Sequence, residues 1–154
     1  MAALYLICGL FGCQNAPKPA KHELSEITAV SISSGHMDRN YGYSFWAHKK
    51  ENGWFLNAEC FTHNYEAETV LENRELDGED AETLLEILKQ SESIAYVENY
   101  KKSKNATVQV ADETIYSFCL TFSDGNQYVT SDRQNDLEKF FYHLAEKYDE
   151  TISK

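Results

Sequence analysis

Histidine and cysteine side chains are the usual metal ligands and nucleophiles of proteins, and this chain has five histidines and four cysteines. They are His22, His36, His48, His63 and His143, and Cys8, Cys13, Cys60 and Cys119. No two histidines stand three or four residues apart, so one helix face would not hold two of them. No two cysteines form the Cys-x-x-Cys pair of zinc and thioredoxin-type redox sites. We therefore expect neither a bound metal nor a cofactor.

Two other patterns could carry chemistry but favour a structural role. Residues 77–80, with the sequence DGED, lack the spacing of a calcium loop and are more typical of a helix N-terminus. Cys119 could act as a nucleophile with a histidine, but its neighbours Phe118 and Leu120 indicate a buried position within a strand. We predict no catalytic residue, and a disulfide between Cys60 and Cys119 remains open.

The stretch most able to form a binding surface is 40–61, two alternating runs joined by Asn52-Gly53. An Asn-Gly dipeptide between such runs predicts a β-hairpin with a two-residue type I′ turn. In that register Phe45 lies opposite Cys60. One face of the hairpin is then wholly apolar or aromatic. It consists of Tyr41, Tyr43, Phe45, Ala47, Trp54, Leu56, Ala58 and Cys60.

The opposite face of this hairpin mixes aromatic and polar side chains. Our candidate binding surface on it consists of Trp46, His48, Phe55, Glu59 and Phe61. Aromatic rings beside a few polar groups suit a protein, peptide or glycan ligand. The alternative is that helices pack on this face too, which would make it part of the core.

Further strands are predicted on both sides of the hairpin. Residues 26–34 alternate as a strand, and residues 64–75 are either irregular or a further edge strand. Residues 94–100 and 107–110 are short strand candidates. Residues 114–122 form a clear strand, because every second side chain is large and apolar.

The strand at 114–122 is followed by a turn and a returning strand at 127–131. Two registers are open for this second hairpin. A two-residue loop puts Val129 beside Leu120, whereas a three-residue loop with Gly125 in the left-handed conformation puts Tyr128 there.

Two amphipathic helices complete the predicted elements. The first begins after Asp77, whose side chain can cap it, and ends near Ser91; the second has Asn135 as its cap. Their apolar stripes are Ala81, Leu84, Leu85 and Leu88, and Leu137, Phe140, Phe141, Leu144 and Tyr148. The fold class is therefore α+β, with an antiparallel sheet built from two hairpins plus flanking strands and two amphipathic helices packed on one face.

Composition narrows the function classes further. The chain of 154 residues is 42% hydrophobic and 13% aromatic, which is enough for the core of one domain. Its formal net charge of −11 argues against binding to nucleic acid, which needs a basic face, and argues equally against charge-driven binding to anionic lipid. We expect the acidic surface to keep the protein soluble, and we expect a monomer.

The first residues of the chain are apolar and uncharged, too few to span a bilayer as a helix but long enough for a signal-peptide core. Residues 10–13, with the sequence LFGC, resemble a bacterial lipobox, in which the thiol of Cys13 would take a lipid. A polar stretch with Pro17 and Pro19 follows and reads as a stiff tether. The alternative is an ordinary buried N-terminal segment, since the first residues carry no positive charge.

The whole architecture resembles small lipoproteins of Gram-positive bacteria, a group that implies no known activity. The resemblance implies a leader at 1–12, a lipid-anchored tether at 13–25 and a single α+β domain at 26–154. The protein would then be extracytoplasmic, attached to the bacterial cell membrane by its lipid. We expect a non-catalytic binding or interaction module there. The alternatives are a surface hydrolase, for example one using Glu59 and His48, and an inhibitor or immunity-like protein with an acidic surface.

Overall fold

The computed structural model describes residues 19–36, 42–61, 67–100 and 114–149. Its elements, in chain order, are a short 3-10 turn η1 (Leu24–Glu26), β1 (Ile27–His36), β2 (Gly42–Lys50), β3 (Gly53–Phe61), β4 (Ala67–Glu75), α1 (Gly78–Gln90), α2 (Ser93–Asn99), β5 (Thr114–Phe122), β6 (Gln127–Thr130) and α3 (Asn135–Tyr148).

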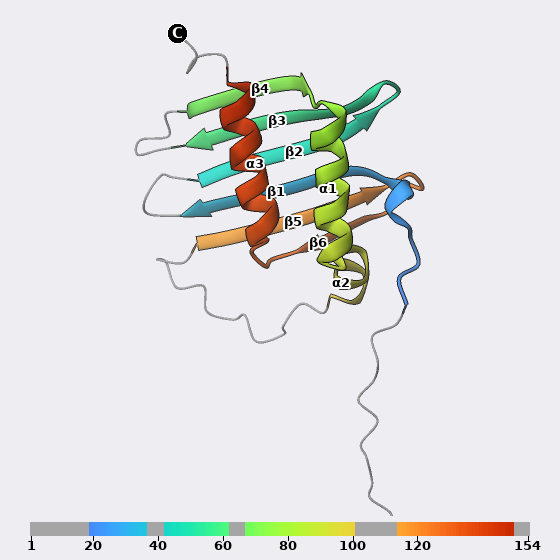
Figure 1. Ribbon diagram of the computed structural model, residues 1–154. Coiled ribbons are helices and arrows are strands. Elements are labelled where there is room, and N and C mark those ends of the chain that lie inside the picture. Colours follow the sequence, from blue (N-terminus) through green and yellow to red (C-terminus); the bar gives the residue numbers. More distant parts are fainter. Residues whose placement is uncertain (1–18, 37–41, 62–66, 101–113, 150–154) are drawn as a thin grey trace, which may run out of the picture.

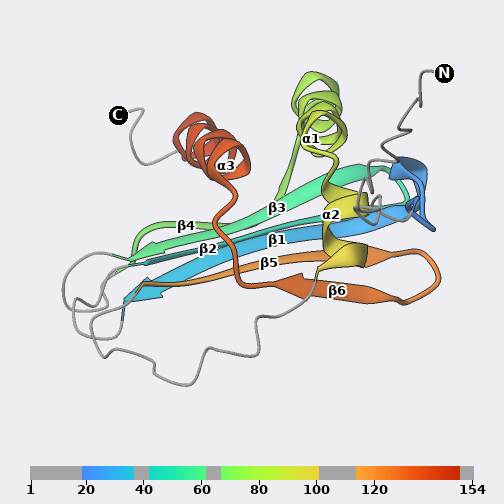
Figure 2. The same cartoon turned by 90° about the horizontal axis from the view of Figure 1, so that it is seen from below.

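The six strands form one antiparallel sheet in the order β4-β3-β2-β1-β5-β6. Helices α1 and α3 lie side by side across the sheet (Figure 1), and the view from below shows both on the same face (Figure 2). This arrangement confirms the predicted α+β fold class. Of the two alternatives for residues 64–75, the edge strand is the one that the described part adopts, since β4 (Ala67–Glu75) forms one border of the sheet.

Within the described residues, which do not include Tyr41, the β2–β3 hairpin has the predicted faces but not the predicted register. Phe45 lies opposite Ala58 rather than Cys60, because the turn residues are Glu51 and Asn52. Neither turn residue has a positive φ, so the turn is not type I′; the positive φ, 149°, falls on Gly53. Moving the turn by one residue slides the strands by two relative to each other, and a slide of two keeps every side chain on its face.

The β5–β6 hairpin adopts the second of the two registers considered. Tyr128 lies opposite Leu120, and Gly125 has a φ of 86° in a three-residue loop. The loop is closed by Asp124, whose carboxylate accepts hydrogen bonds from the backbone and side-chain nitrogens of Asn126 at 2.9 and 2.7 Å.

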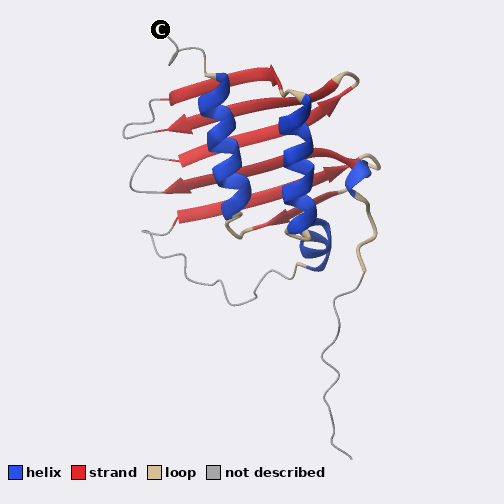
Figure 3. Ribbon diagram, viewed as in Figure 1, coloured by secondary structure: helices blue, strands red, loops and turns tan. Residues whose placement is uncertain are grey.

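The strand predicted at 94–100 is wrong, because these residues form helix α2 (Figure 3). Ile94 and Val97 are both buried, and a separation of three residues places them on one helix face. Glu92 separates α2 from α1 with a φ of 50°. The strand predicted at 107–110 lies outside the described residues.

Helix α1 begins as predicted, with the Oδ1 atom of Asp77 accepting a hydrogen bond from the Asp80 amide at 2.8 Å. Helix α3 begins one residue earlier than predicted: Gln134 occupies the cap position, without a side-chain cap bond, and Asn135 is already helical. The helices and one face of the sheet enclose the core. Its largest fully buried side chains are Ile27, Val30, Phe45, Leu56, Leu84, Leu88, Phe118, Leu120, Phe122, Leu137, Phe141 and Leu144.

A polar cluster joins the two helices at one end. The ammonium of Lys147 lies 2.7 Å from a carboxylate oxygen of Asp77 and 2.7 Å from one of Asp80. The hydroxyl of Tyr148 donates to Asp80 at 2.6 Å. Asp80 is only 7% exposed, so these bonds satisfy a carboxylate that burial would otherwise destabilise.

Contacts with the folded domain begin before residue 26, inside the stretch predicted as tether. The backbone amides of Lys21 and His22 both donate to the Glu98 carboxylate on α2. The imidazole of His22 also lies 2.5 Å from Glu98 and 2.9 Å from Asp124. The segment from Lys21 onward is therefore attached to the domain.

Candidate functional site

The face of the sheet opposite α1 and α3 carries no helix within the described part of the chain (Figure 2). The alternative in which helices pack on both faces is therefore wrong for these residues. Four large apolar residues are exposed on this face, with exposed fractions between 46% and 60%. They are Trp46, Val70, Ile115 and Val129. We call it the open face.

Three rings form a ladder on the open face. Trp46 and His48 alternate along β2, and their rings stack with centroids 4.2 Å apart and planes 17° apart. His48 lies opposite Phe55 of β3, at a centroid distance of 6.1 Å. The period of two along each strand places all three rings on the same side. The imidazole therefore supports the indole, which remains 46% exposed.

Lys50 extends the ladder and adds positive charge. Its ammonium lies 4.5 Å from the centroid of the Phe55 ring and donates to the side-chain oxygen of Asn73 at 3.0 Å. Partial burial, followed by the charge of Lys50, lowers the pKa of His48 below its ordinary value of 6.5. The imidazole is therefore neutral at pH 7, and the ladder holds one cation rather than two.

A hollow of about 300 Å³ opens beside Trp46, between β2, β3 and β4. It is lined by Ser44, Trp46, Asn57, Ala58, Glu59, Leu71, Glu72 and Asn73. Asn57 is held in place, because its side-chain oxygen accepts from the Asn73 amide at 3.0 Å. Within the described residues, the side chains of Glu59 and Glu72 have no hydrogen bond or ion pair. Their charges are free to meet a ligand.

The register of β2 and β3 places all five predicted surface residues on the open face, since Trp46, His48, Phe55, Glu59 and Phe61 all alternate with core-facing side chains. Phe61 lies at the end of β3, where it also borders a different hollow of about 280 Å³ that Tyr43 and Tyr142 line. The predicted surface therefore runs along β3 from Phe55 to the end of the strand.

That second hollow contains a satisfied charge cluster. Two guanidinium nitrogens of Arg133 each lie 2.7 Å from the Glu138 carboxylate, and the hydroxyl of Tyr43 donates to it at 2.9 Å. The hydrogen bonds from Arg133 lower the pKa of Glu138 against the effect of burial. These groups are bonded to one another, which fits a structural role at the start of α3.

Sequence reasoning did not identify Glu72 and Asn73, which complete the hollow beside Trp46. They join it because β4 bulges where it pairs with β3, and Asn73 adopts a φ of 49°. Asparagine is among the non-glycine residues most often found with a positive φ. An Asn in an otherwise extended acidic run was the only available signal.

The geometry contradicts the proposed hydrolase pair. His48 lies opposite Phe55, and Glu59 lies four residues further along the same strand. Four residues of a strand span about 13 Å, far beyond the hydrogen-bond reach that a base and its partner need. The two side chains share a face but do not form a catalytic pair.

The two described cysteines do not form a disulfide. Cys60 packs against the core, whereas Cys119 alternates with buried Phe118 and Leu120 and so points to the open face. Strands β2 and β1 also separate their strands. Burial raises the pKa of the Cys119 thiol above its ordinary value, so the thiol is protonated at neutral pH and poorly nucleophilic.

The described residues contain no group of three or more histidine, cysteine, aspartate or glutamate side chains that could hold a metal ion. The absence of a metal stays a prediction. Among the helices described, none has both the length and the apolar character needed to cross a bilayer. Cys13 lies outside the described residues.

Comparison with known proteins gave no match: no family model, no curated protein and no solved structure is similar to this chain.

Proposed function

We propose that the protein is a lipid-anchored extracytoplasmic binding module without catalytic activity, and that its ligand binds on the open face of the sheet. The observation that carries this proposal is the exposed indole of Trp46, stacked on His48 beside a hollow with free carboxylates. Burying a large aromatic side chain contributes roughly 1.5–3 kcal/mol. An indole held rigid in solvent is therefore a ready contact for a ligand.

The arrangement of polar groups favours binding over catalysis. His48 and Glu59 are too far apart to exchange a proton, and Cys119 is a protonated thiol. Side chains on strands of a well-paired sheet are also rigidly placed, which reduces the entropy lost when a ligand binds.

Support for the lipid anchor comes from the sequence alone. Residues 10–13 (LFGC) resemble a lipobox, and the polar stretch with Pro17 and Pro19 separates Cys13 in sequence from Lys21, whose backbone amide bonds Glu98 of the domain. In this proposal the lipid on Cys13 holds the protein at the outer side of the cell membrane.

Binding is tested by probing a peptide array and a glycan array with labelled protein and with two variants. Trp46→Ala removes the indole at the centre of the proposed site. Val129→Ala, the matched control, removes an exposed apolar side chain from the same face near the opposite border. We expect every array signal of the unsubstituted protein to fall about 10-fold or more in Trp46→Ala, since aromatic anchors of this kind contribute about 2 kcal/mol or more to binding. Val129→Ala should keep these signals. Signals that survive in Trp46→Ala, or no signal with either array, would contradict the proposal.

A further inference from the structure

The hollow beside Trp46 combines an aromatic ring with unpaired negative charge. We infer that it binds the ammonium group of a lysine side chain, presented by a basic peptide segment of a partner protein. This inference rests on the proposed function, because it names the ligand of the same face.

The first argument is the placement of two carboxylates. Glu59 of β3 lies opposite Val70, and Glu72 stands two residues further along β4, so both side chains project from the open face. Both are exposed, and both line the hollow. The two negative charges lie diagonally on neighbouring strands and repel each other. No lysine or arginine of the described residues forms an ion pair with either, so the pair attracts a cation from outside.

The second argument is the indole itself. A lysine ammonium is attracted to the face of an aromatic ring, and tryptophan is the best partner for it. The ladder next to the hollow already contains such an arrangement, since the Lys50 ammonium lies on the Phe55 ring and also bonds the side-chain oxygen of Asn73. The hollow offers an incoming ammonium the same two partners, an aromatic ring and a side-chain oxygen. Trp46 provides the ring, and the carboxylates of Glu59 and Glu72 take the place of the Asn73 amide oxygen.

The third argument concerns the size of the ligand. The surface continues from the hollow onto Val70, an apolar side chain that is 53% exposed and lies opposite Glu59. Strand β4 borders the sheet, where an extended peptide can lie alongside. A small amine would fill the hollow and leave Val70 in water, whereas a peptide can cover both. The net charge of −11 also speeds the approach of a basic partner.

The probe for this inference is a ten-residue peptide of alternating lysine and serine, compared with the same peptide acetylated on every lysine. The chain has two tryptophans, and Trp54 is only 6% exposed. Nuclear magnetic resonance therefore reports binding at Trp46 through its indole N–H, with Trp54 as an internal reference. We expect the lysine peptide to shift the Trp46 signal alone, and acetylation to weaken binding about 10-fold.

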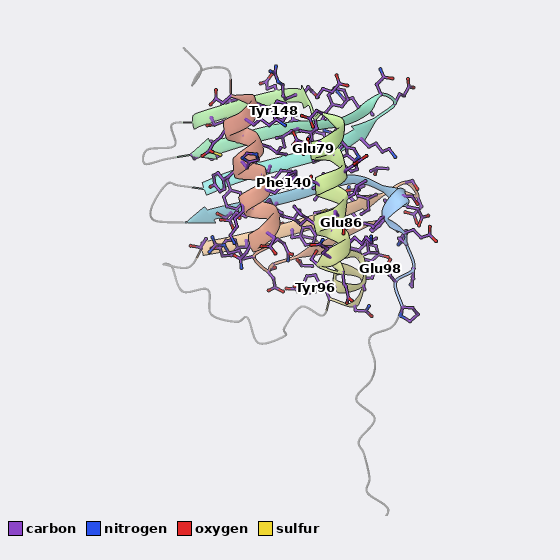
Figure 4. The ribbon with its side chains drawn as sticks, viewed as in Figure 1. Glu79, Glu86, Tyr96, Glu98, Phe140 and Tyr148 are labelled. Atoms are coloured by element: carbon purple, nitrogen blue, oxygen red, sulfur yellow. The ribbon has the colours of Figure 1, made fainter. Side chains whose placement is uncertain are left out.

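Charge-neutralising variants distinguish the hollow from the general acidity of the protein. Glu59→Gln combined with Glu72→Gln should weaken lysine-peptide binding about 5-fold or more. The matched control is Glu79→Gln combined with Glu82→Gln, which removes the same charge from α1 on the helix-covered side, where Figure 4 shows Glu79. We expect the control to change binding less than about 2-fold.

Five outcomes would overturn the inference. Equal losses in both double variants would show long-range attraction without a site. Equal binding of the acetylated peptide would show that the ligand is not a cation. Equal binding of spermidine, a free polyamine, would show that no peptide is needed. If a neutral glycan shifts the Trp46 signal, the lysine inference is wrong and the proposed function is still supported. If no probe shifts the Trp46 signal, both proposals are wrong.

Discussion

Phe45 and Trp46 are neighbours in the chain but belong to opposite faces of the sheet. Phe45 is fully buried and stacks on Phe141 of α3 at a centroid distance of 5.5 Å, whereas Trp46 is 46% exposed. Replacing Phe45 with alanine should therefore destabilise the protein by about 3–5 kcal/mol. Replacing Trp46 with alanine should cost less than about 1 kcal/mol, because it leaves no cavity. Denaturant unfolding of both variants measures the difference.

Equal destabilisation by the two variants would show that the open face is covered in the native protein. Trp46 would then be a core residue, and the proposed binding surface would lose its central side chain.

Cys13 carries the prediction about anchoring. If residues 10–13 act as a lipobox, the thiol of Cys13 takes the lipid and the leader before it is removed. Expressed with a complete leader, Cys13→Ala should leave an unprocessed precursor, and the mature form should disappear from the membrane fraction. Cys60→Ala is the control, since Cys60 packs against the core. Normal processing of Cys13→Ala, seen by mass spectrometry, would refute the lipid anchor.

At the scale of elements, the β2–β3 turn depends on Gly53. Its φ of 149° is one that other residues rarely adopt, yet an added Cβ would meet only a side-chain oxygen of Glu75, at 3.8 Å. The cost of a substitution is therefore backbone strain rather than collision. Gly53→Val should destabilise the protein by about 1–3 kcal/mol, and Gly53→Ala by less. Thermal melts compare the two, and a neutral Gly53→Val would show that the turn can rearrange without cost.

The polar cluster between α1 and α3 makes a second prediction at this scale. Lys147→Met removes the cation that bridges Asp77 and Asp80, and leaves the nearly buried Asp80 bonded to Tyr148. We expect a lower melting temperature. The matched control is Lys139→Met on the same helix, since Lys139 approaches Asp136 only to 3.9 Å in an exposed pair. Equal melting temperatures for the two variants would show that the cluster does not stabilise helix packing.

The elements also show what the sequence could and could not predict. Alternation along β2 and β3 places Trp46, His48 and Phe55 on one face whatever the turn does, so the face was predictable. The register was not, because turn geometry alone decides it. Helix α2 was missed because its short apolar run fits either periodicity. Glu72 joins the site through a bulge in strand pairing, for which Asn73 was the only local signal.

At the scale of the whole molecule, His22 attaches the N-terminal segment to two distant parts of the chain. Its ring bonds Glu98 of α2 and Asp124 of the β5–β6 turn, and stacks on Phe122 with centroids 4.1 Å apart. The side chain is 9% exposed. Both ring nitrogens face carboxylates, and only a protonated imidazole can donate to both.

This attachment should depend on pH. Hydrogen bonds to Asp124, and then to Glu98, raise the pKa of His22 above its ordinary value of 6.5. A raised pKa in the folded state means that the stabilisation is present in full below 6.5 and is lost as the pH rises through the folded value. The pKa of Asp124 is lowered, chiefly by the hydrogen bond from His22. The stabilisation that the Asp124 carboxylate contributes is therefore lost as the pH falls below 3.8, the ordinary pKa of this carboxyl. His22→Ala should therefore lower the melting temperature at pH 5.5 more than at pH 8.5.

The control for this comparison is His143→Ala, since His143 is exposed on α3. A melting-temperature difference between His22→Ala and the unsubstituted protein that stays constant from pH 5.5 to pH 8.5 would show that protonation of His22 does not strengthen the attachment.

The central position of β1 in the sheet has a consequence for when the protein can fold. β1 pairs with β2 nearby in sequence, but its other partner is β5, and the hydroxyl of Thr28 bonds the backbone of Thr121, 93 residues away. Chains dominated by such distant pairings fold on the order of milliseconds to seconds, slower than helical domains. The pairing of β1 with β5 cannot be completed until the chain has been synthesised as far as Phe122. For a protein exported as we propose, this delay keeps the chain unfolded while it is threaded through the membrane.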